Sequence, residues 1–227
     1  GMCKKALFWD FDGTLIHPNE SFLCALKAAL EHAQYAVETD VIRKFLHTVC
    51  TWYKPEISYQ GATGAKWWGT LFRNFEWFYK QNHVAEADWQ TVNMIFKDSI
   101  LDHRNYTLYD GAKDILQKCQ EMGYRNYILS NNFPELPWVI DKLGLSDCFA
   151  GYIVSSNVGF FQYALRTARY PDLAYMIGDN PVADIQGGRS AGMKTILVHN
   201  NLSNEMAEDG VVCENLSDVV KAMEHES

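Results

Sequence analysis

The sequence predicts an α/β fold, in which a doubly wound, Rossmann-like parallel sheet core carries an inserted α-helical cap. Short apolar segments alternate with helical segments over residues 109–198, as is typical of a parallel sheet with helices on both faces. Another apolar run, residues 6–9, lies near the N-terminus. Between these regions the pattern is almost entirely helical. We therefore expect the core to comprise residues 1–16 and 109–227, and the cap to comprise residues 17–108.

The N-terminal half is expected to contain one strand, residues 5–10, and four helices. Apolar side chains recur at helical spacing from Phe22 to Leu30, with Asn19 or Ser21 as the N-cap. The other three helices are expected at residues 39–50, 65–81 and 85–100. The third of the four helices is rich in aromatic residues. We interpret four of them as the core of the cap: Trp67, Trp68, Phe72 and Phe75.

In the C-terminal half, helices and strands are expected to alternate. A helix over residues 112–122 ends at Gly123, a residue type common at helix C-termini. The strand at residues 127–129 follows and leads into Ser130-Asn131-Asn132. The remaining elements are a helix at 135–143, a strand at 151–154, a helix at 161–169, a strand at 174–177, a helix ending near residue 191 and a strand at 195–198.

The overall charge narrows the classes of partner. The formal net charge is −8 and the pI is near 5.3, which argues against nucleic acid or an anionic membrane as partner. No apolar segment is long enough for a membrane span, and no secretory leader is evident. The six cysteines have no metal-ligand spacing, so we expect reduced, buried cysteines in a cytoplasmic protein.

Polar side chains follow three of the expected strands directly. Asp10 and Asp12 follow the first, Ser130 and Asn131 follow the second, and Asp179 and Asp184 follow the strand at 174–177. The carboxyl ends of parallel strands open on one edge of a sheet, where ligands bind. Clustered carboxylates are costly without a cation, and Mg²⁺ prefers oxygen ligands. A carboxylate can also attack phosphorus, so this arrangement suggests phosphoryl transfer.

Three segments, in the correct order, resemble motifs of the haloacid dehalogenase superfamily. Residues 8–15 (Phe-Trp-Asp-Phe-Asp-Gly-Thr-Leu) are similar to its first motif, and residues 128–131 (Ile-Leu-Ser-Asn) to its second. Residues 178–185 together with 191–195 resemble its fourth. Dehalogenase members lack the second aspartate of the first motif. The resemblance therefore implies a Mg²⁺-dependent phosphatase that acts on a small phosphorylated metabolite.

The resemblance implies roles for the four aspartates. Asp10 would be the nucleophile and a metal ligand. Asp12 would be the acid/base catalyst and would give the metal its backbone carbonyl. Asp179 would bind Mg²⁺, and Asp184 would complete the acidic cluster. The alternative for Asp184 is a charge at a helix terminus without a ligand role.

The resemblance also implies how the phosphate is held. Thr14 would support Asp12 and the phosphate-binding turn. Ser130, helped by the backbone of Asn131, would hold the phosphoryl oxygens. Without the resemblance, Ser130-Asn131-Asn132 would be read as a turn or an N-cap. The helical cap would close over the site and select the substrate.

One motif departs from the family. Its third motif supplies a lysine at the start of a helix, whereas here Val158-Gly159-Phe160-Phe161 runs into a helix with no lysine. Either the lysine loop is truly deleted, or the sequence lacks a loop that the protein possesses between Gly159 and Phe161, and we favour the second explanation. Arg166 and Arg169 could replace the lysine in part, but we interpret them as surface residues of that helix.

Three functions remain compatible with these residues. The leading hypothesis is a phosphatase that forms an aspartyl-phosphate. A chain that truly lacks the lysine would be an impaired, binding-only relative. A phosphotransferase or mutase would share the first half-reaction. The sequence identifies neither the substrate nor the oligomeric state.

Overall fold

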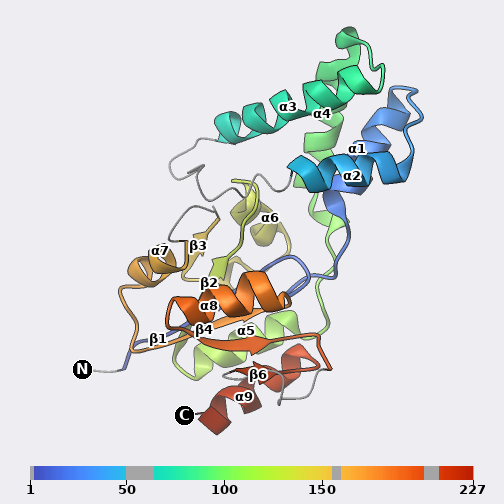
Figure 1. The fold of residues 1–227 in the computed structure, drawn as a ribbon. Coiled ribbons are helices and arrows are strands. Elements are labelled where there is room, and N and C mark those ends of the chain that lie inside the picture. Colours follow the sequence, from blue (N-terminus) through green and yellow to red (C-terminus); the bar gives the residue numbers. More distant parts are fainter. Residues whose placement is uncertain (1–2, 50–63, 155–159, 202–209, 227) are drawn as a thin grey trace.

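The computed structural model describes residues 3–49, 64–154, 160–201 and 210–226 (Figure 1). Its centre is a six-stranded parallel sheet of order β3-β2-β1-β4-β5-β6. The strands are β1 (Lys5–Trp9), β2 (Tyr124–Leu129), β3 (Gly151–Ile153), β4 (Leu173–Gly178), β5 (Lys194–Leu197) and β6 (Val211–Val212). The strand order reverses between β1 and β4, which is where ligands bind in open α/β sheets.

Helices cover both faces of the sheet, and the central strands are buried on both sides. Leu7 and Trp9 of β1 pack with α5, α6 and α9, whereas Ala6 and Phe8 pack with α7 on the other face. This double burial explains why β1 is a continuous apolar run rather than an alternating one. The helices of the core are α5 (Ala112–Glu121), α6 (Leu136–Lys142), α7 (Phe160–Thr167), α8 (Gly187–Ser190) and α9 (Val219–Glu226). The predicted doubly wound core is confirmed.

A helical cap is inserted after β1 and stands apart from the sheet, beyond the strand ends (Figure 1). Its helices are α1 (Ser21–His32), α2 (Thr39–Val49), α3 (Gly64–Gln81) and α4 (Glu86–Leu101). Trp67, Trp68 and Phe75 are buried in it, and the Phe75 ring packs edge-on against Phe96 at 5.0 Å. Phe72 is partly buried against the same cluster. The inserted cap is confirmed, while its boundaries at 17 and 108 stay a prediction.

The two segments that join cap and core run side by side. The His17 amide donates to the Thr107 carbonyl, and the Tyr109 amide donates to the Leu15 carbonyl, both at 2.9 Å. These bonds bring the entry and the exit of the cap together, close to the end of β1. Any movement of the cap therefore acts on the segment that carries Asp12.

Several elements differ from the expectation. β6 and α9 were not predicted, and β2 begins at Tyr124 rather than at residue 127. Glu20, rather than Asn19 or Ser21, is the N-cap of α1, and its side chain makes no capping bond. Short turns of 3-10 helix lie at His103–Asn105, Ser146–Cys148 and Leu216–Asp218.

The expectation of buried cysteines holds only in part. Cys119, Cys148 and Cys213 are buried and free, but Cys3 and Cys24 are free and exposed. Cys50 lies outside the described residues. None of the helices in the described residues is both long and apolar enough to cross a membrane.

Candidate active site

The candidate site lies at the carboxyl ends of β1, β2 and β4. The Asp10 amide donates to the Ile177 carbonyl of β4 at 2.9 Å, so the sheet ladder continues to the first residue of the site. The Ser130 amide likewise donates to Ile153 of β3 at 3.0 Å. Backbone bonds at the sheet edge therefore fix both the first acidic residue and the serine.

Three carboxylates from two strand ends converge at this edge. Oxygen atoms of Asp10, Asp179 and Asp184 all lie within 4.8 Å of one another. Oxygen donors at this spacing suit a hard divalent cation such as Mg²⁺. The resemblance implies that Asp12 offers the metal its backbone carbonyl and that Asp184 completes the acidic cluster, and the side chains that converge in the structure are those of Asp10, Asp179 and Asp184.

Two glycines permit this close approach. Gly13 has φ +75°, and a Cβ atom built there would overlap the Asp179 carboxylate. A Cβ atom at Gly178 would overlap the Asp184 carboxylate. A left-handed conformation and the lack of a side chain are both properties of glycine, so Gly13 is required on both counts.

Thr14 makes a side-chain hydrogen bond to the acidic cluster. Its buried hydroxyl donates to Asp179 Oδ1 at 3.2 Å, so the residue expected to support Asp12 instead contacts the other acidic segment. His199 Nε2 donates to the Thr14 carbonyl at 2.7 Å, and its ring stacks on Tyr109 with 3.6 Å between centroids. These contacts tie the turn after β1 to the end of β5 and to the exit of the cap.

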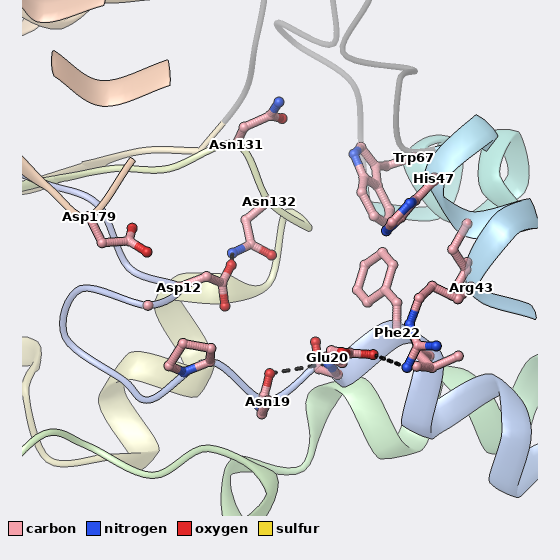
Figure 2. A pocket seen from close by; sticks show the side chains of 15 residues that line it. Asp12, Asn19, Glu20, Phe22, Arg43, His47, Trp67, Asn131, Asn132 and Asp179 are labelled. Atoms are coloured by element: carbon pink, nitrogen blue, oxygen red, sulfur yellow. Dashed lines mark hydrogen bonds and ion pairs between the residues drawn. The ribbon is translucent and has the colours of Figure 1, made fainter. Parts of the chain in front are cut away.

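Asn132 is the main contact of Asp12 and was missed by sequence reasoning. Its Nδ2 donates to Asp12 Oδ2 at 2.7 Å and lies 3.4 Å from the buried Ser130 hydroxyl (Figure 2). Loss of water around the Asp12 carboxyl raises its pKa to about 6, while the bond from Asn132 lowers it and the charge of Asp179 raises it. An acid with this pKa can both donate and accept a proton near neutral pH. Asn131, by contrast, is half-buried and lines the adjacent pocket.

The other carboxyls of the cluster share this electrostatic environment. Burial raises the pKa of Asp10 well above its usual value, and the charges of Asp184, Asp12 and Asp179 raise it further. Burial raises the pKa of Asp184 to about 6. The charges that raise the pKa of Asp10 most all come from carboxylates, and a backbone hydrogen bond from Phe11 lowers it.

Asp184 lies in a short π-helical segment, Pro181–Gln186, where the sequence suggests a regular helix up to about residue 191. The Asn180 side chain caps this segment by accepting bonds from the Val182 and Ala183 amides, each at 2.9 Å. The Asn180 amide in turn donates to Asp184 Oδ2 at 3.1 Å. Such π-helical turns are frequent at functional sites, and this one turns Asp184 inward.

The expected lysine segment falls largely outside the described residues. Phe160 and Phe161 are consecutive residues of α7, but Gly159 and the residues before it, back to 155, are not described. The choice between a deleted and a missing loop therefore stays open. Arg166 in α7 and Arg169, which lies after the end of that helix, are both exposed, as predicted.

A pocket of about 500 Å³ opens between the acidic cluster and the cap (Figure 2). Asp12, Asp179 and Asn132 lie on its core side. Phe22, Arg43 and Trp67 lie on its cap side. A volume of this size is typical of a small-molecule site.

Comparison with known proteins shows the family. The sequence model of the haloacid dehalogenase-like hydrolases matches residues 4–192. Human haloacid dehalogenase-like hydrolase domain-containing protein 3 is 29% identical over 209 residues, covering 86% of this chain and 81% of that protein. Glyceraldehyde 3-phosphate phosphatase of Pyrococcus abyssi is 30% identical over 206 residues, covering 85% and 80%.

Solved structures show the same fold. The HAD-hydrolase YfnB from Bacillus subtilis, bound to magnesium, matches with a TM-score of 0.68 at 19% identity, over 97% of this chain and 98% of that one. The family match, the fold and the ordered motifs agree with one another. The chain therefore belongs to the haloacid dehalogenase-like family, and it is a hydrolase.

Proposed function

We propose that this protein is a Mg²⁺-dependent phosphatase that hydrolyses a small phosphomonoester through an aspartyl-phosphate on Asp10. The observation that carries the proposal is the convergence of Asp10, Asp179 and Asp184 within 4.8 Å, beside a carboxyl, Asp12, whose pKa is about 6. The name of the Pyrococcus relative, a phosphatase of glyceraldehyde 3-phosphate, supports the reaction type.

The donor set fits Mg²⁺. Asp10, Asp179 and Asp184 would hold the ion, together with the backbone carbonyl of Asp12. Burial and neighbouring carboxylates raise the pKa values of Asp10 and Asp184, a divalent charge would stabilise their ionised forms, and all the donors are oxygen. When bound, the ion would neutralise the cluster and polarise the phosphoryl group. The magnesium in the YfnB structure supports the choice of metal.

The first half-reaction uses Asp10 and Asp12. A carboxylate oxygen of Asp10 attacks phosphorus, and the bond from phosphorus to the ester oxygen breaks. Asp12 donates its proton to the leaving oxygen, which departs as an alcohol. Asn132 holds the Asp12 carboxyl toward the pocket through their 2.7 Å bond.

The second half-reaction returns the enzyme to its starting state. Asp12, now ionised, takes a proton from water, and the water oxygen attacks phosphorus. The bond between phosphorus and Asp10 breaks, which releases inorganic phosphate and leaves Asp12 protonated. Ser130, the Asn131 backbone and the Thr14 turn would hold the phosphoryl oxygens through both steps. Cap closure would exclude bulk water and strengthen these charge interactions.

The experiment is p-nitrophenyl phosphate hydrolysis with and without Mg²⁺. We expect Mg²⁺-dependent phosphate release, abolished by EDTA and lost in Asp10→Asn. Asp172→Asn is the matched control, because Asp172 accepts a bond from the exposed Lys4 amide far from the pocket residues. Equal activity in Asp10→Asn and the wild type would rule out the covalent mechanism.

A second candidate function rests on the absence of the family lysine from Val158-Gly159-Phe160-Phe161. A chain that truly lacks this lysine would bind phosphorylated metabolites without turning them over, since the charges that raise the pKa of Asp10 most are carboxylates. Tight Mg²⁺-dependent binding of a phosphate ester with no phosphate release would favour this function over the phosphatase.

A further inference from the structure

We propose that the pocket selects phosphomonoesters whose organic group is uncharged and partly apolar, and that Glu20 is the residue that rejects anionic groups. This inference rests on the proposed function, since it concerns the leaving group at the same site. It follows from the charges and the apolar surface on the cap side of the pocket, which lies across from Asp12 and Asp179 (Figure 2).

Away from the acidic cluster, the charged residues that line the pocket in the described part of the chain are one carboxylate and one cation. Among the described residues that line it, the carboxylates are Asp12, Asp179 and Glu20, and the only formal cation is Arg43, with histidine counted as neutral. Mg²⁺ would balance carboxylates near Asp12 but not those across the pocket. An organic group that extends toward the cap therefore meets Glu20 and Arg43.

Arg43 already has two carboxylate partners. Its Nη2 lies 3.2 Å from Glu20 Oε2 (Figure 2), and its Nη1 lies 2.9 Å from Asp40 Oδ1. Exposed ion pairs of this kind are weak, so a substrate anion could displace one of them. Displacement would not remove the carboxylate, which stays beside the anion. Because Glu20 already neutralises Arg43, an anionic organic group gains little from the guanidinium and meets the displaced carboxylate.

Glu20 has a backbone conformation that is unfavourable for a residue with a side chain. Glu20 has φ 45° and ψ 49°, a left-handed conformation that a residue with a side chain seldom adopts. Its carboxylate does not cap α1, although it occupies the N-cap position, and is turned to Arg43 instead. Asn19 fixes the turn by accepting a bond from the Ser21 amide at 3.1 Å and donating to the Asn105 carbonyl at 2.9 Å. A strained residue held by its neighbours is typical of a functional position.

The remaining cap side of the pocket is largely apolar. Phe22, Leu23, Leu46 and Trp67 all line it, and all but Phe22 are buried. An aromatic or aliphatic organic group can remove water from these side chains, which a small polyol phosphate cannot do to the same extent. The preferred organic group is therefore apolar as well as uncharged.

The test compares two isosteric esters, 4-carbamoylphenyl phosphate and 4-carboxyphenyl phosphate, which differ in one charge. In the wild type we expect kcat/KM to be about tenfold higher for the carbamoyl ester, because the added negative charge must displace the Glu20 carboxylate from Arg43 and remains beside it. Glu20→Gln should narrow this ratio at least threefold, and Arg43→Gln should widen it. Glu31→Gln is the matched control on α1, because Glu31 pairs with Lys27 outside the pocket lining, and it should leave the ratio unchanged.

Binding to the Asp10→Asn variant with Mg²⁺, followed by calorimetry, separates this inference from the proposed function. The carbamoyl ester should bind more tightly than the carboxyl ester, and glycerol 1-phosphate should bind more weakly than the carbamoyl ester. Equal or tighter binding of the carboxyl ester, equal binding of glycerol 1-phosphate, an unchanged ratio in Glu20→Gln, or no binding of either aryl ester would each overturn the inference. Selective binding without hydrolysis by the wild type would overturn the phosphatase and leave the selectivity standing.

Discussion

In the proposed mechanism, proton transfer depends on the contact between Asp12 and Asn132. The 2.7 Å bond both orients the Asp12 carboxyl and lowers its pKa, against the desolvation that raises the pKa to about 6. We propose that Asn132 acts on the substrate through Asp12, as a positioning residue. Its contribution should appear in the pH dependence of the reaction as well as in the rate.

The first prediction concerns Asn132→Ala. Removing a bond that favours the ionised form raises the pKa of Asp12, so the protonated acid needed in the first step persists to higher pH. We expect the alkaline limb of the kcat/KM profile to move to higher pH and the maximal rate to fall about tenfold. Asn131→Ala is the control for the limb, since the Asn131 side chain makes no hydrogen bond to Asp12 within the described part of the chain. If the alkaline limb of the kcat/KM profile stays at the wild-type pH in Asn132→Ala, Asn132 does not lower the pKa of the catalytic acid.

The second prediction compares two glycines with nearly the same backbone. Gly13 has φ +75° beside Asp179, whereas Gly111 has φ +78° and open space within 4 Å of the position that a Cβ atom would take. Alanine at either site should lower the free energy of unfolding by about 1–2 kcal/mol through left-handed strain. Only Gly13→Ala should also displace Asp179 and abolish phosphate release. Urea unfolding measures the stability of both variants, and p-nitrophenyl phosphate assays measure their activity. Full activity in Gly13→Ala would contradict the close approach of Gly13 to Asp179.

At the scale of elements, Trp68 and Glu135 link cap helix α3 to the core. The Trp68 indole donates to both carboxylate oxygens of Glu135, at 3.0 and 2.7 Å, and packs near Phe133 with 6.2 Å between ring centroids. Glu135 precedes α6, which follows the Ser130 loop directly. The position of α3 is thereby coupled to the loop proposed to hold phosphate.

The third prediction tests this link with Glu135→Ala and Glu135→Gln. Loss of both acceptors should let α3 separate from the core, so amide hydrogen exchange in α3 should rise and KM should increase severalfold. Glutamine keeps one acceptor oxygen and should lie between alanine and the wild type. Exchange rates in α3 that are identical in all three proteins would show that the contact does not hold the cap.

The elements differ in how well the sequence predicts them. The continuous apolar run of β1 and the polar residues after β1, β2 and β4 predicted both the sheet and the edge where the acidic cluster forms. β6 has only two residues and α9 only eight, so neither has a strong pattern. The π-helical turn at Pro181–Gln186 depends on the Asn180 cap and on Asp184 facing inward, which periodicity does not encode.

The residues of the candidate site also differ in how well the sequence predicts their contacts. Asp10, Asp179 and Asp184 converge as expected from parallel strand ends, because topology alone brings these ends together. The contact of Asn132 with Asp12 and the pairing of Glu20 with Arg43 depend on turn conformations and on how the cap sits over the core. The hydroxyl of Thr14 reaches Asp179 for the same reason. Residue roles that depend on such contacts require the structure.

At the scale of the whole molecule, the acidic cluster opposes folding unless a cation or protons compensate it. Asp10, Asp12 and Asp184 all have pKa values raised above 3.8, so the folded protein binds more protons than the unfolded chain between about pH 4 and pH 6. The contribution of these groups to stability is therefore highest at acidic pH and is lost as pH rises through their folded-state pKa values.

The fourth prediction follows from the loss of this contribution to stability as pH rises. In EDTA, Asp184→Asn should gain roughly 1–1.5 kcal/mol of stability relative to the wild type between pH 5 and pH 7.5, because about one pKa unit of the shift from 3.8 to about 6 takes effect over this interval and each pKa unit corresponds to about 1.4 kcal/mol. Mg²⁺ should stabilise the wild type more at pH 7.5 than at pH 5, because its ligands must be ionised. Urea unfolding at both pH values measures both effects. A wild-type advantage over Asp184→Asn that grows with pH in EDTA would contradict the assignment of a destabilising cluster.

The most direct test of the proposed mechanism is chemical trapping of the phosphorylated enzyme. The protein would be mixed with Mg²⁺ and p-nitrophenyl phosphate, quenched in acid and reduced with borohydride, which converts an aspartyl-phosphate to homoserine. Peptide mass spectrometry should then find homoserine at Asp10 in the wild type and at no other position, with none in Asp10→Asn. Substrate-dependent reduction at a different aspartate, or active turnover with no reduced residue at Asp10, would contradict the account.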